Sequence, residues 1–446
     1  MADASCSTDR PGALDITRKL AKICDPPFAR LAGPADEVAG RTARWVAVPG
    51  GPHAAAEVLR LAAAHDLTVV PRGAGTKIDW GAAPAQVDIM LDTGRLAGVR
   101  HEPGAAVLAE IGAGTPLRAV QATLGRTGLR LPVDAPSPGA TLGGVLAADE
   151  AGPLRLRHGG PCAQLVGVRY LDADGELISG DLPGLDVARL LCGSQGGLGV
   201  LVSATMRVHA RPASRVWVSR PVWTPLEVHD LVRAVLAAEV QPAAVELDLP
   251  VPVPLPRRRI PASHPSVSGR PDHPAVTGRP AAGNLVVLLE GGPADVVERV
   301  GRLTAVLGAE SVVNHRPPEW WGRYPFAPGD TALRIEVPVD HLHAAVYALR
   351  DAAGTPMAVR GSAGVGAVHA ALPGVMPPER VASILGAVRS VLVARQGRCV
   401  VVAAPAPVRR AVDLWGEWPT LSRLRSAKAH LDPHRRLAPG RLPGGL

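Results

Sequence analysis

The chain has 446 residues, 47% of them hydrophobic and only 3% aromatic, so it is long enough to form two domains with aliphatic cores. Its formal net charge of +8 comes mostly from arginines spread along the whole chain, without a basic helix or an aromatic-interleaved motif, so we expect no nucleic-acid partner. No apolar run reaches the roughly 18 residues of a transmembrane helix, and residues 1–10 lack the apolar core of a secretory signal, so we expect a cytoplasmic chain without a transmembrane segment.

In the first half of the chain, strand-like and helix-like segments alternate. Residues 1–33 lack clear periodicity, and only residues 16–23 suggest one or two helical turns. The segments that follow are a helix at 53–65, strands at 67–70, 87–91 and 107–111, a helix at 116–125, and a hairpin at 164–179 that turns at 172–175. We expect Thr115 to cap the helix at 116–125, with Pro116 in its first position. This mixture fits an α+β domain.

The pattern changes near residues 211–212, after which strands and helices begin again. The second half contains a helix at 228–240, strands at 245–249 and 285–289, and a helix at 294–307. Between them, residues 250–283 carry repeated prolines, a basic cluster and a near-repeat. Such a stretch buries little apolar surface, so we expect an exposed, mobile loop and leave open whether it binds a partner.

Three glycine-rich loops are the most informative motifs. The first, Pro71–Lys77, directly follows the strand at 67–70, and the others cover residues 137–144 and 193–201. Glycine lets backbone approach a ligand closely, and clustered N–H groups form an anion-binding concavity, to which Arg72 adds positive charge. None of the three has the Rossmann or P-loop pattern. Taken alone, each loop could also be a turn without a ligand; taken together, they suggest a phosphate or pyrophosphate site.

The order of these loops resembles the FAD-binding oxidoreductases of the vanillyl-alcohol oxidase and p-cresol methylhydroxylase (PCMH) type. Within that family the chain is most similar to the FAD-binding subunit of bacterial glycolate oxidase. The resemblance runs from about residue 32 to the C-terminus. Besides the loops, it includes residues 43–46, 91–96, 112–117, 154–159, 330–335, 360–364 and 431–441.

The resemblance implies an α+β fold with a two-part PCMH-type FAD-binding domain and a smaller α+β cap domain built on an antiparallel sheet. The implied organisation is an N-terminal extension at 1–33, the FAD-binding domain at 34–212, the cap at 213–430 and a C-terminal segment at 431–446 that packs back on the FAD-binding domain.

The cofactor implied by the resemblance is FAD. Relatives that tether FAD covalently at the first loop often carry a histidine where Thr76 stands here, so we expect non-covalent binding. The residues expected to bind FAD are Pro71, Arg72, Gly73, Ala74, Gly75, Thr76, Gly139, Ala140, Thr141, Gly143, Gly144, Gly193, Gly199 and Val200.

The substrate implied by the resemblance is a small 2-hydroxy acid such as glycolate or lactate. Arginine recognises a carboxylate through paired N–H donors, and a histidine can accept the hydroxyl proton as hydride leaves for the flavin. The candidates are Arg334, Arg360 and His369, with Arg323 and Tyr324 in the aromatic patch at 320–326. For each of them a structural role, as an ion-paired strand face or a core residue, stays open.

The five cysteines, Cys6, Cys24, Cys162, Cys192 and Cys399, form no C-x-x-C pair and no metal-ligand spacing. We therefore expect buried or incidental thiols rather than disulfides, and no metal or iron–sulfur site. Without an internal relay, electrons would leave the flavin through a partner subunit, such as an iron–sulfur protein, or another acceptor.

Two departures from close relatives bear on turnover. Relatives carry a Lys-Asn-Val-Ala-Gly-Tyr-Asp segment before the third loop, where this chain has the shorter segment 180–186, which keeps only Gly184 and Asp186. Asp149 and Glu150 stand where relatives usually have Asn-Ala. These changes favour a second hypothesis, that the chain is a non-catalytic subunit with an FAD fold that acts in assembly of an oxidoreductase complex.

Overall fold

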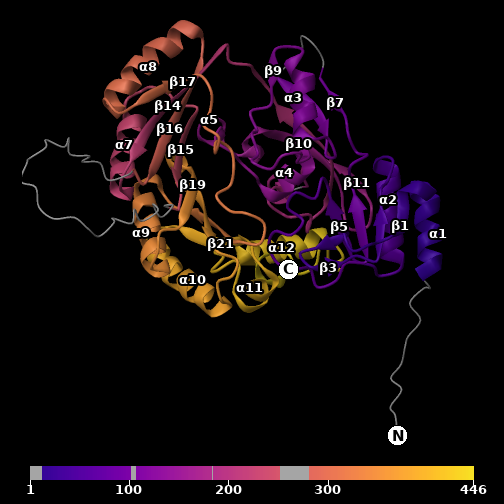
Figure 1. The fold of residues 1–446 in the computed structure, drawn as a ribbon. Helices are drawn as coiled ribbons and strands as arrows, with labels where there is room; N and C mark the ends of the chain where they lie inside the picture. Colours follow the sequence, from indigo (N-terminus) through magenta and orange to yellow (C-terminus); the bar gives the residue numbers. More distant parts are fainter. Residues whose placement is uncertain (1–12, 102–106, 183, 252–280) are drawn as a thin grey trace, which may run out of the picture.

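The computed structural model describes residues 13–101, 107–182, 184–251 and 281–446, so most of the Pro-rich segment predicted at 250–283 lies outside the described residues. Figure 1 shows two bodies, an N-terminal one in indigo and magenta and a C-terminal one in orange, with the yellow C-terminal residues beneath both. Within the described ranges, none of the helices is long and apolar enough to span a bilayer.

The first part of the N-terminal body is a small sheet with the strand order β1-β4-β6-β5. Its strands are β1 (Ala29–Leu31), β4 (Trp45–Ala47), β5 (Val69–Arg72) and β6 (Ile89–Asp92), next to the two-stranded pair β2 (Glu37–Val38) and β3 (Arg41–Thr42). Helices α1 (Ala13–Cys24) and α2 (Pro52–Ala64) share one apolar core with this sheet, in which Ile16, Leu59 and Trp45 are buried. The predicted helix at 53–65 and strand at 87–91 are confirmed within two residues.

The second part of the N-terminal body is an antiparallel sheet with the order β11-β10-β12-β8-β7. Its elements are β7 (Val99–Arg100), β8 (Leu108–Gly112), α3 (Leu117–Gly125), α4 (Leu142–Ala148), α5 (Arg155–His158), η2 (Pro161–Gln164), β10 (Leu165–Leu171), β11 (Leu177–Ser179), α6 (Val187–Leu191) and β12 (Val200–Arg207), with the small pair β9 (Leu129–Arg130) and β13 (His209–Ala210). The predicted hairpin at 164–179 is confirmed.

The predicted cap of the 116–125 helix is wrong. Pro116 is itself the N-cap residue of α3, with an extended backbone and no capping side chain. Thr115 Oγ1 instead hydrogen-bonds both the N–H and the C=O of Gly98, which fastens the loop before α3 to the preceding loop. Because Pro116 has a ψ of 137°, outside the helical region, the helix begins one residue later than expected.

The C-terminal body is an eight-stranded antiparallel sheet in the order β17-β14-β16-β15-β19-β20-β18-β21. Its strands are β14 (Ser214–Val222), β15 (Ala244–Leu249), β16 (Gly283–Gly291), β17 (Val312–Asn314), β18 (Thr331–Glu336), β19 (Ala358–Ser362), β20 (Ala367–Leu372) and β21 (Arg398–Ala403). Helices α7 (Pro225–Ala237), α8 (Pro293–Leu307), α9 (Leu342–Ala353) and α10 (Pro378–Val393) cover its outer face and bury one large aliphatic core against it (Figure 1). The predicted fold class, with an antiparallel cap sheet after the α+β domain, is confirmed.

The inner face of this sheet packs against the N-terminal body. Helix α5 contacts β15 and the short helix η4 (Ala363–Val365). Close by, Glu290 on β16 is buried and accepts hydrogen bonds from Arg130 on β9, and Arg215 lies 2.9 Å from the same carboxylate. The two arginines lower the pKa of Glu290 against the opposing effect of burial. This three-residue ion cluster fixes one body against the other.

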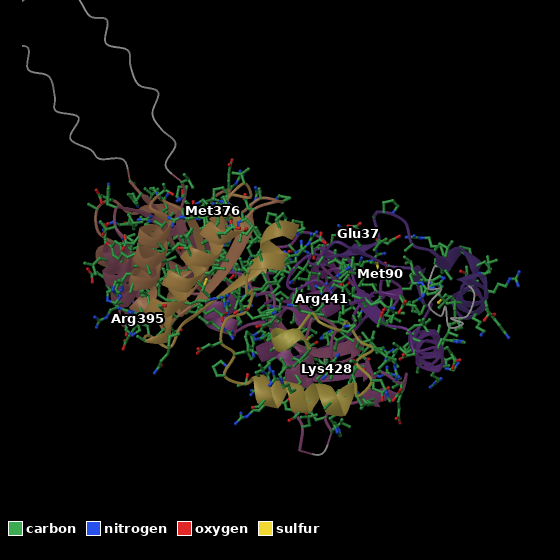
Figure 2. The ribbon with its side chains drawn as sticks, turned by 90° about the horizontal axis from the view of Figure 1, so that it is seen from below. Glu37, Met90, Met376, Arg395, Lys428 and Arg441 are labelled. Carbon is green, nitrogen blue, oxygen red and sulfur yellow. A yellow bond between two sulfur atoms is a disulfide. The ribbon has the colours of Figure 1, made fainter. Side chains whose placement is uncertain are left out.

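The last residues of the chain return to the N-terminal body after α11 (Ala406–Ala411) and α12 (Leu421–Leu431). Leu437 pairs in parallel with Val69 at the start of β5. Lys428 on α12 is 2% exposed and donates hydrogen bonds to the carboxylate of Asp432 and to the carbonyl oxygens of Gly197 and Leu437, at 2.6–2.7 Å (Figure 2). The C-terminal segment is therefore attached both to strand β5, which leads into the first glycine loop, and to the third glycine loop.

Candidate functional site

The three glycine loops meet around one cavity of about 490 Å³, within the size range of small-molecule and cofactor sites. The loop that follows β5 forms one wall, the N-terminal end of α4 a second, and the loop between α6 and β12 a third. Strands β18 and β21 of the C-terminal body close the remaining side. The cavity thus lies between the two bodies of the chain.

The first loop presents unused backbone donors to this cavity. No hydrogen bond in the described part of the chain involves the N–H groups of Gly73, Ala74, Gly75 or Thr76, all of which line the cavity. Gly73 and Gly75 are half-buried, whereas Ala74 and Thr76 are exposed. Successive N–H groups that are not used within the chain form a concavity that suits an anionic ligand.

Two glycines allow the loops to approach so closely. A Cβ atom on Gly73 would lie 2.2 Å from Oγ1 of Thr141 in the second loop, and one on Gly196 would lie 3.0 Å from Pro71 in the first. Both distances are below normal van der Waals contact. Glycine at these positions is therefore a packing requirement of the three-loop wall.

Most of the residues predicted to bind FAD line the cavity, and three do not. Gly139, Ala140 and Val200 lie outside the wall, the first two ahead of Thr141 and the last inside β12. The predicted residues on the wall are Pro71, Arg72, Gly73, Ala74, Gly75, Thr76, Thr141, Gly143, Gly144, Gly193 and Gly199.

The charge of Arg72 is already partnered. Its guanidinium donates to Asp92 at 2.8 Å and to Asp36 at 3.3 Å. Five further residues bring positive charge to the cavity wall, and the glycine-loop motifs do not predict that these five line one cavity. They are Lys77, Arg189, Arg334, Arg398 and Arg441.

The C-terminal body contributes a polar and aromatic wall that the glycine motifs do not predict. Arg334 and Glu336 on β18 and Arg398 on β21 form an ion cluster, in which Arg398 Nη2 lies 2.5 Å from Glu336 and Arg334 Nε donates to Glu336 at 2.8 Å. Burial favours the neutral acid, but the two guanidinium groups lower the pKa of Glu336 to about 2. Trp415 and Trp418, in the loop after α11, complete this wall.

Arg441, from the C-terminal segment, reaches the same cavity. It donates to the carbonyl oxygens of Ile78 and Trp80, which directly follow the first glycine loop, at 3.0 and 2.7 Å (Figure 2). Burial lowers the pKa of its guanidinium to about 10. The resemblance at residues 431–441 is the one sequence signal that pointed to this segment.

The three predicted catalytic residues lie in one row across neighbouring strands. His369 on β20 is the register partner of Arg334 on β18 and of Arg360 on β19. They do not share one cavity: Arg334 lines the large one, whereas Arg360 and His369 line a neighbouring cavity of about 30 Å³. Arg360 is paired with Asp248, to which its Nε donates at 2.8 Å.

His369 is held in its neutral form. Burial, together with the charges of Arg334 and Arg155, lowers its pKa from 6.5 to about 3. Its ring contacts Tyr324 edge-on at a centroid distance of 4.8 Å, and Tyr324 stacks in turn with Phe326 at 4.8 Å. The neutral imidazole has a lone pair that can accept a proton, and its pKa of about 3 makes it a weaker base than an ordinary histidine.

Glu150, one of the departures from relatives, connects the two bodies. Its Oε1 accepts a hydrogen bond from the Tyr324 hydroxyl at 2.8 Å and lies 2.5 Å from Lys77 Nζ. Burial raises the pKa of Tyr324 and lowers that of Lys77. The ammonium of Lys77 also lies 4.3 Å from the ring centroid of Trp80, which makes this a compact network at the edge of the cavity.

The prediction of free thiols is wrong for two of the cysteines. Cys162 in η2 and Cys192 at the end of α6 form a disulfide, and both line the cavity. They are 30 residues apart in sequence, and no local spacing signals that the fold brings η2 against the third loop. Cys24 and Cys399 are buried free thiols, and Cys6 lies outside the described residues.

We expect the disulfide to stabilise the wall formed by α6 and the third loop. Replacing both cysteines by serine should lower the free energy of unfolding by about 2–4 kcal/mol under oxidising conditions, because the unfolded chain regains conformational freedom. Chemical denaturation with and without dithiothreitol measures this. Dithiothreitol should destabilise the native chain and leave the double variant unchanged; an equal effect on both would contradict the assignment.

The divergent segment 180–186 leads into the same wall. Leu182 and Leu185 form a β-bridge, and Asp186 caps α6 by accepting a hydrogen bond from the Arg189 N–H at 3.0 Å. Arg189 then lines the cavity. The shortened segment thus places an arginine at the site.

Comparisons with known proteins agree with this geometry. Residues 43–181, which include the first two glycine loops, match the model of the family described as FAD binding domain. This part of the chain is an FAD binding domain. The cofactor is FAD, and the unused N–H groups, the glycine contacts and the arginine-lined cavity fit its pyrophosphate and ring.

Curated relatives match only part of the chain. The D-2-hydroxyglutarate dehydrogenase of Xanthomonas citri pv. viticola is 32% identical over 184 residues, which is 38% of this chain and 39% of that protein. The D-lactate dehydrogenase of Archaeoglobus fulgidus is 28% identical over 210 residues, 45% of this chain and 46% of that protein. The glycolate oxidase subunit GlcE of Escherichia coli is 36% identical over 118 residues, 24% of this chain and 33% of that protein. Each match thus spans less than half of the relative's length.

A solved structure of alkyldihydroxyacetonephosphate synthase shares the fold of the whole chain. It has a TM-score of 0.70 at 14% identity and covers 99% of this chain and 86% of that one. At this identity the likeness concerns the fold alone, and it extends over both bodies and the C-terminal segment.

Proposed function

We propose that the protein is an FAD-dependent oxidoreductase that oxidises a small 2-hydroxy acid, of the glycolate or lactate kind, with FAD bound non-covalently. The observation that carries the proposal is the junction of the FAD cavity with the row Arg334–His369, which supplies positive charge and a neutral base on adjacent strands. The partial similarity to D-2-hydroxyglutarate and D-lactate dehydrogenases supports the same substrate class.

When bound, FAD supplies the hydride acceptor. The residues of the chain would do the remaining work. Positive charge on the wall, which includes Arg334, the register partner of His369, would attract the substrate anion. The ring nitrogen of His369 would accept the proton of the substrate hydroxyl. Trp80, which lines the FAD cavity, packs with Tyr324 and Phe326, whose rings in turn contact His369, and these rings would exclude water near His369.

The test is anaerobic mixing of the FAD-loaded protein with glycolate, D-lactate, L-lactate and D-2-hydroxyglutarate. We expect loss of the flavin absorbance with at least one of them. Replacing His369 by glutamine should slow this loss by about 100-fold or more, within the range for a general base, while the FAD content stays unchanged. An unreduced flavin with every 2-hydroxy acid would contradict the proposal.

The pH dependence of flavin reduction follows from the pKa of His369. Because that pKa is lowered to about 3, the imidazole stays neutral throughout the range in which an ordinary histidine would become protonated. We expect the reduction rate to be flat between about pH 5 and pH 7 rather than to fall below pH 6.5. Stopped-flow rates over this range measure it, and an acid limb near pH 6.5 would contradict the lowered pKa of His369.

A second candidate is a non-catalytic subunit that binds FAD and acts in assembly of an oxidoreductase complex. The altered segment 180–186 and the match to one subunit of glycolate oxidase support it. In the catalytic case a partner subunit or another acceptor would take the electrons from the flavin. Co-purification of the tagged chain with a complex, combined with an unreduced flavin, would favour this second function.

A further inference from the structure

The small cavity beside His369, here called the interdomain chamber, is lined by charged groups from both bodies. Its main polar residues are Arg155, Glu246, Tyr324, Arg360, Ser362 and His369. Helix α5 brings Arg155 from the FAD-binding domain onto β15 and η4 of the C-terminal body, and Figure 1 shows this short helix between the two bodies. With a volume of about 30 Å³, the chamber has room for two small polar groups such as the oxygens of a carboxylate.

Of the three arginines that the sequence offers as substrate anchors, Arg323 is exposed, and Arg334 and Arg360 are already used within the protein. Arg334 is paired with Glu336, and Arg360 donates to Asp248 and to the carbonyl oxygen of Tyr324, at 3.1 Å. Neither guanidinium is free to turn its full fork of donors toward a ligand without giving up a carboxylate partner. A free anchor has to come from elsewhere.

Arg155 is the half-buried cation of the chamber that has no partner among the described residues. Its side chain is half-buried, and it forms neither a hydrogen bond nor an ion pair with any part of the chain that the structure describes. Its charge acts on His369, Glu246 and Tyr324, which places the guanidinium among these groups. A half-buried guanidinium without a carboxylate partner keeps its N–H donors available for an anion from outside the chain.

Glu246, on β15, also indicates that the chamber can bind an anion from outside the chain. It is 5% exposed, it lines the chamber, and its Oε1 has no hydrogen-bond partner among the described residues. Burial, helped by the nearby charge of Asp134 and opposed by Ser362 and Arg155, raises its pKa to about 8. At neutral pH it is therefore a carboxylic acid that can donate a hydrogen bond to an anion rather than repel it.

We propose that the interdomain chamber is a carboxylate-binding site in which Arg155 holds the anion through paired N–H donors and Glu246 donates a further hydrogen bond. The inference deepens the proposed function, because such a site would hold the carboxylate of a 2-hydroxy acid next to His369. It assigns the anchor to Arg155 in place of Arg334 or Arg360. Arg155 is then a substrate-positioning residue.

The test is isothermal titration calorimetry of the FAD-loaded protein with oxalate, a carboxylate that cannot be oxidised as a 2-hydroxy acid. We expect the Arg155→Met variant to bind oxalate at least about 10-fold more weakly than the native chain, and Arg155→Lys to lose part of the affinity because it keeps the charge without the fork. Arg157→Met, an exposed arginine on the same helix, is the matched control and should bind normally. Melting temperature and FAD content, unchanged in all three variants, show that the fold is intact.

Equal oxalate affinity in the native chain and Arg155→Met, or no binding by the native chain, would overturn the proposal. An equally large loss in Arg323→Met, at the exposed edge of the chamber, would also overturn the assignment to Arg155. The proposed oxidation is tested separately by anaerobic flavin reduction. If oxalate binding depends on Arg155 but no 2-hydroxy acid reduces the flavin, the anion site is supported and the oxidase function is contradicted. If a 2-hydroxy acid reduces the flavin equally fast in the native chain and in Arg155→Met, the oxidase function is supported and the role of Arg155 as substrate anchor is contradicted.

Discussion

Replacing Lys428 by methionine is expected to lower the free energy of unfolding by about 3–5 kcal/mol, because the substitution removes the partner of a buried carboxylate. Asp432 is fully buried, and it would keep only the N–H donors of Arg436 and Leu437 to balance its charge. The same substitution releases the carbonyl oxygen of Gly197, so the third glycine loop should loosen and FAD affinity should fall as well. Urea denaturation followed by circular dichroism measures the first effect.

The matched control is Lys19→Met. Lys19 lies 2.8 Å from Asp15 in an exposed pair on α1, and exposed pairs contribute at most about 1 kcal/mol. A loss for Lys428→Met no larger than that of Lys19→Met would mean that the C-terminal segment is held by its apolar contacts alone.

Replacing Gly73 by alanine is expected to weaken FAD binding by about 10- to 100-fold, the effect of an overpacked contact of 1–3 kcal/mol. The added Cβ would meet Thr141 Oγ1 at 2.2 Å and separate the first loop from the second, which displaces the four unused N–H groups. Titration of the apoprotein with FAD, followed by flavin fluorescence, gives the dissociation constant.

Two further variants isolate the contact. Gly386→Ala, within α10, meets no atom within 4 Å and should bind FAD like the native chain. Adding Thr141→Ala to Gly73→Ala removes the clashing hydroxyl and should restore part of the affinity. If the double variant binds no better than Gly73→Ala, the clash with Thr141 is not the cause of the loss.

The parts of the site that depend on local sequence could be predicted, and the parts that depend on long-range packing could not. Glycines directly after a strand, as in Pro-Arg-Gly-Ala-Gly-Thr, predict a loop whose backbone can approach a ligand closely. The first loop and its N–H groups could therefore be predicted from the local sequence. The contact between Gly73 and Thr141 joins segments 68 residues apart, and only the family resemblance linked them. Neither the local sequence nor the family resemblance predicted the disulfide between Cys162 and Cys192.

The same distinction applies to the arginines. The sequence contains many arginines and does not show which of them are paired with acidic side chains in the folded protein. Arg72 and Arg360 stand in recognisable motifs and are paired with acids from other segments, and Arg334 is paired with Glu336 on its own strand, whereas Arg155 lacks such a partner among the described residues. Whether a guanidinium is free to bind a ligand is a property of the tertiary structure, and motif matching selects the residue type without this information.

The most direct test of the account is the visible spectrum of the purified chain after incubation with FAD and removal of the unbound cofactor. The three-loop cavity predicts flavin absorbance bands corresponding to one FAD per chain, and release of that FAD into the supernatant when the protein is precipitated with acid, since Thr76 offers no covalent attachment. A chain that retains no flavin absorbance after this treatment would contradict the central claim that the three glycine loops form an FAD site.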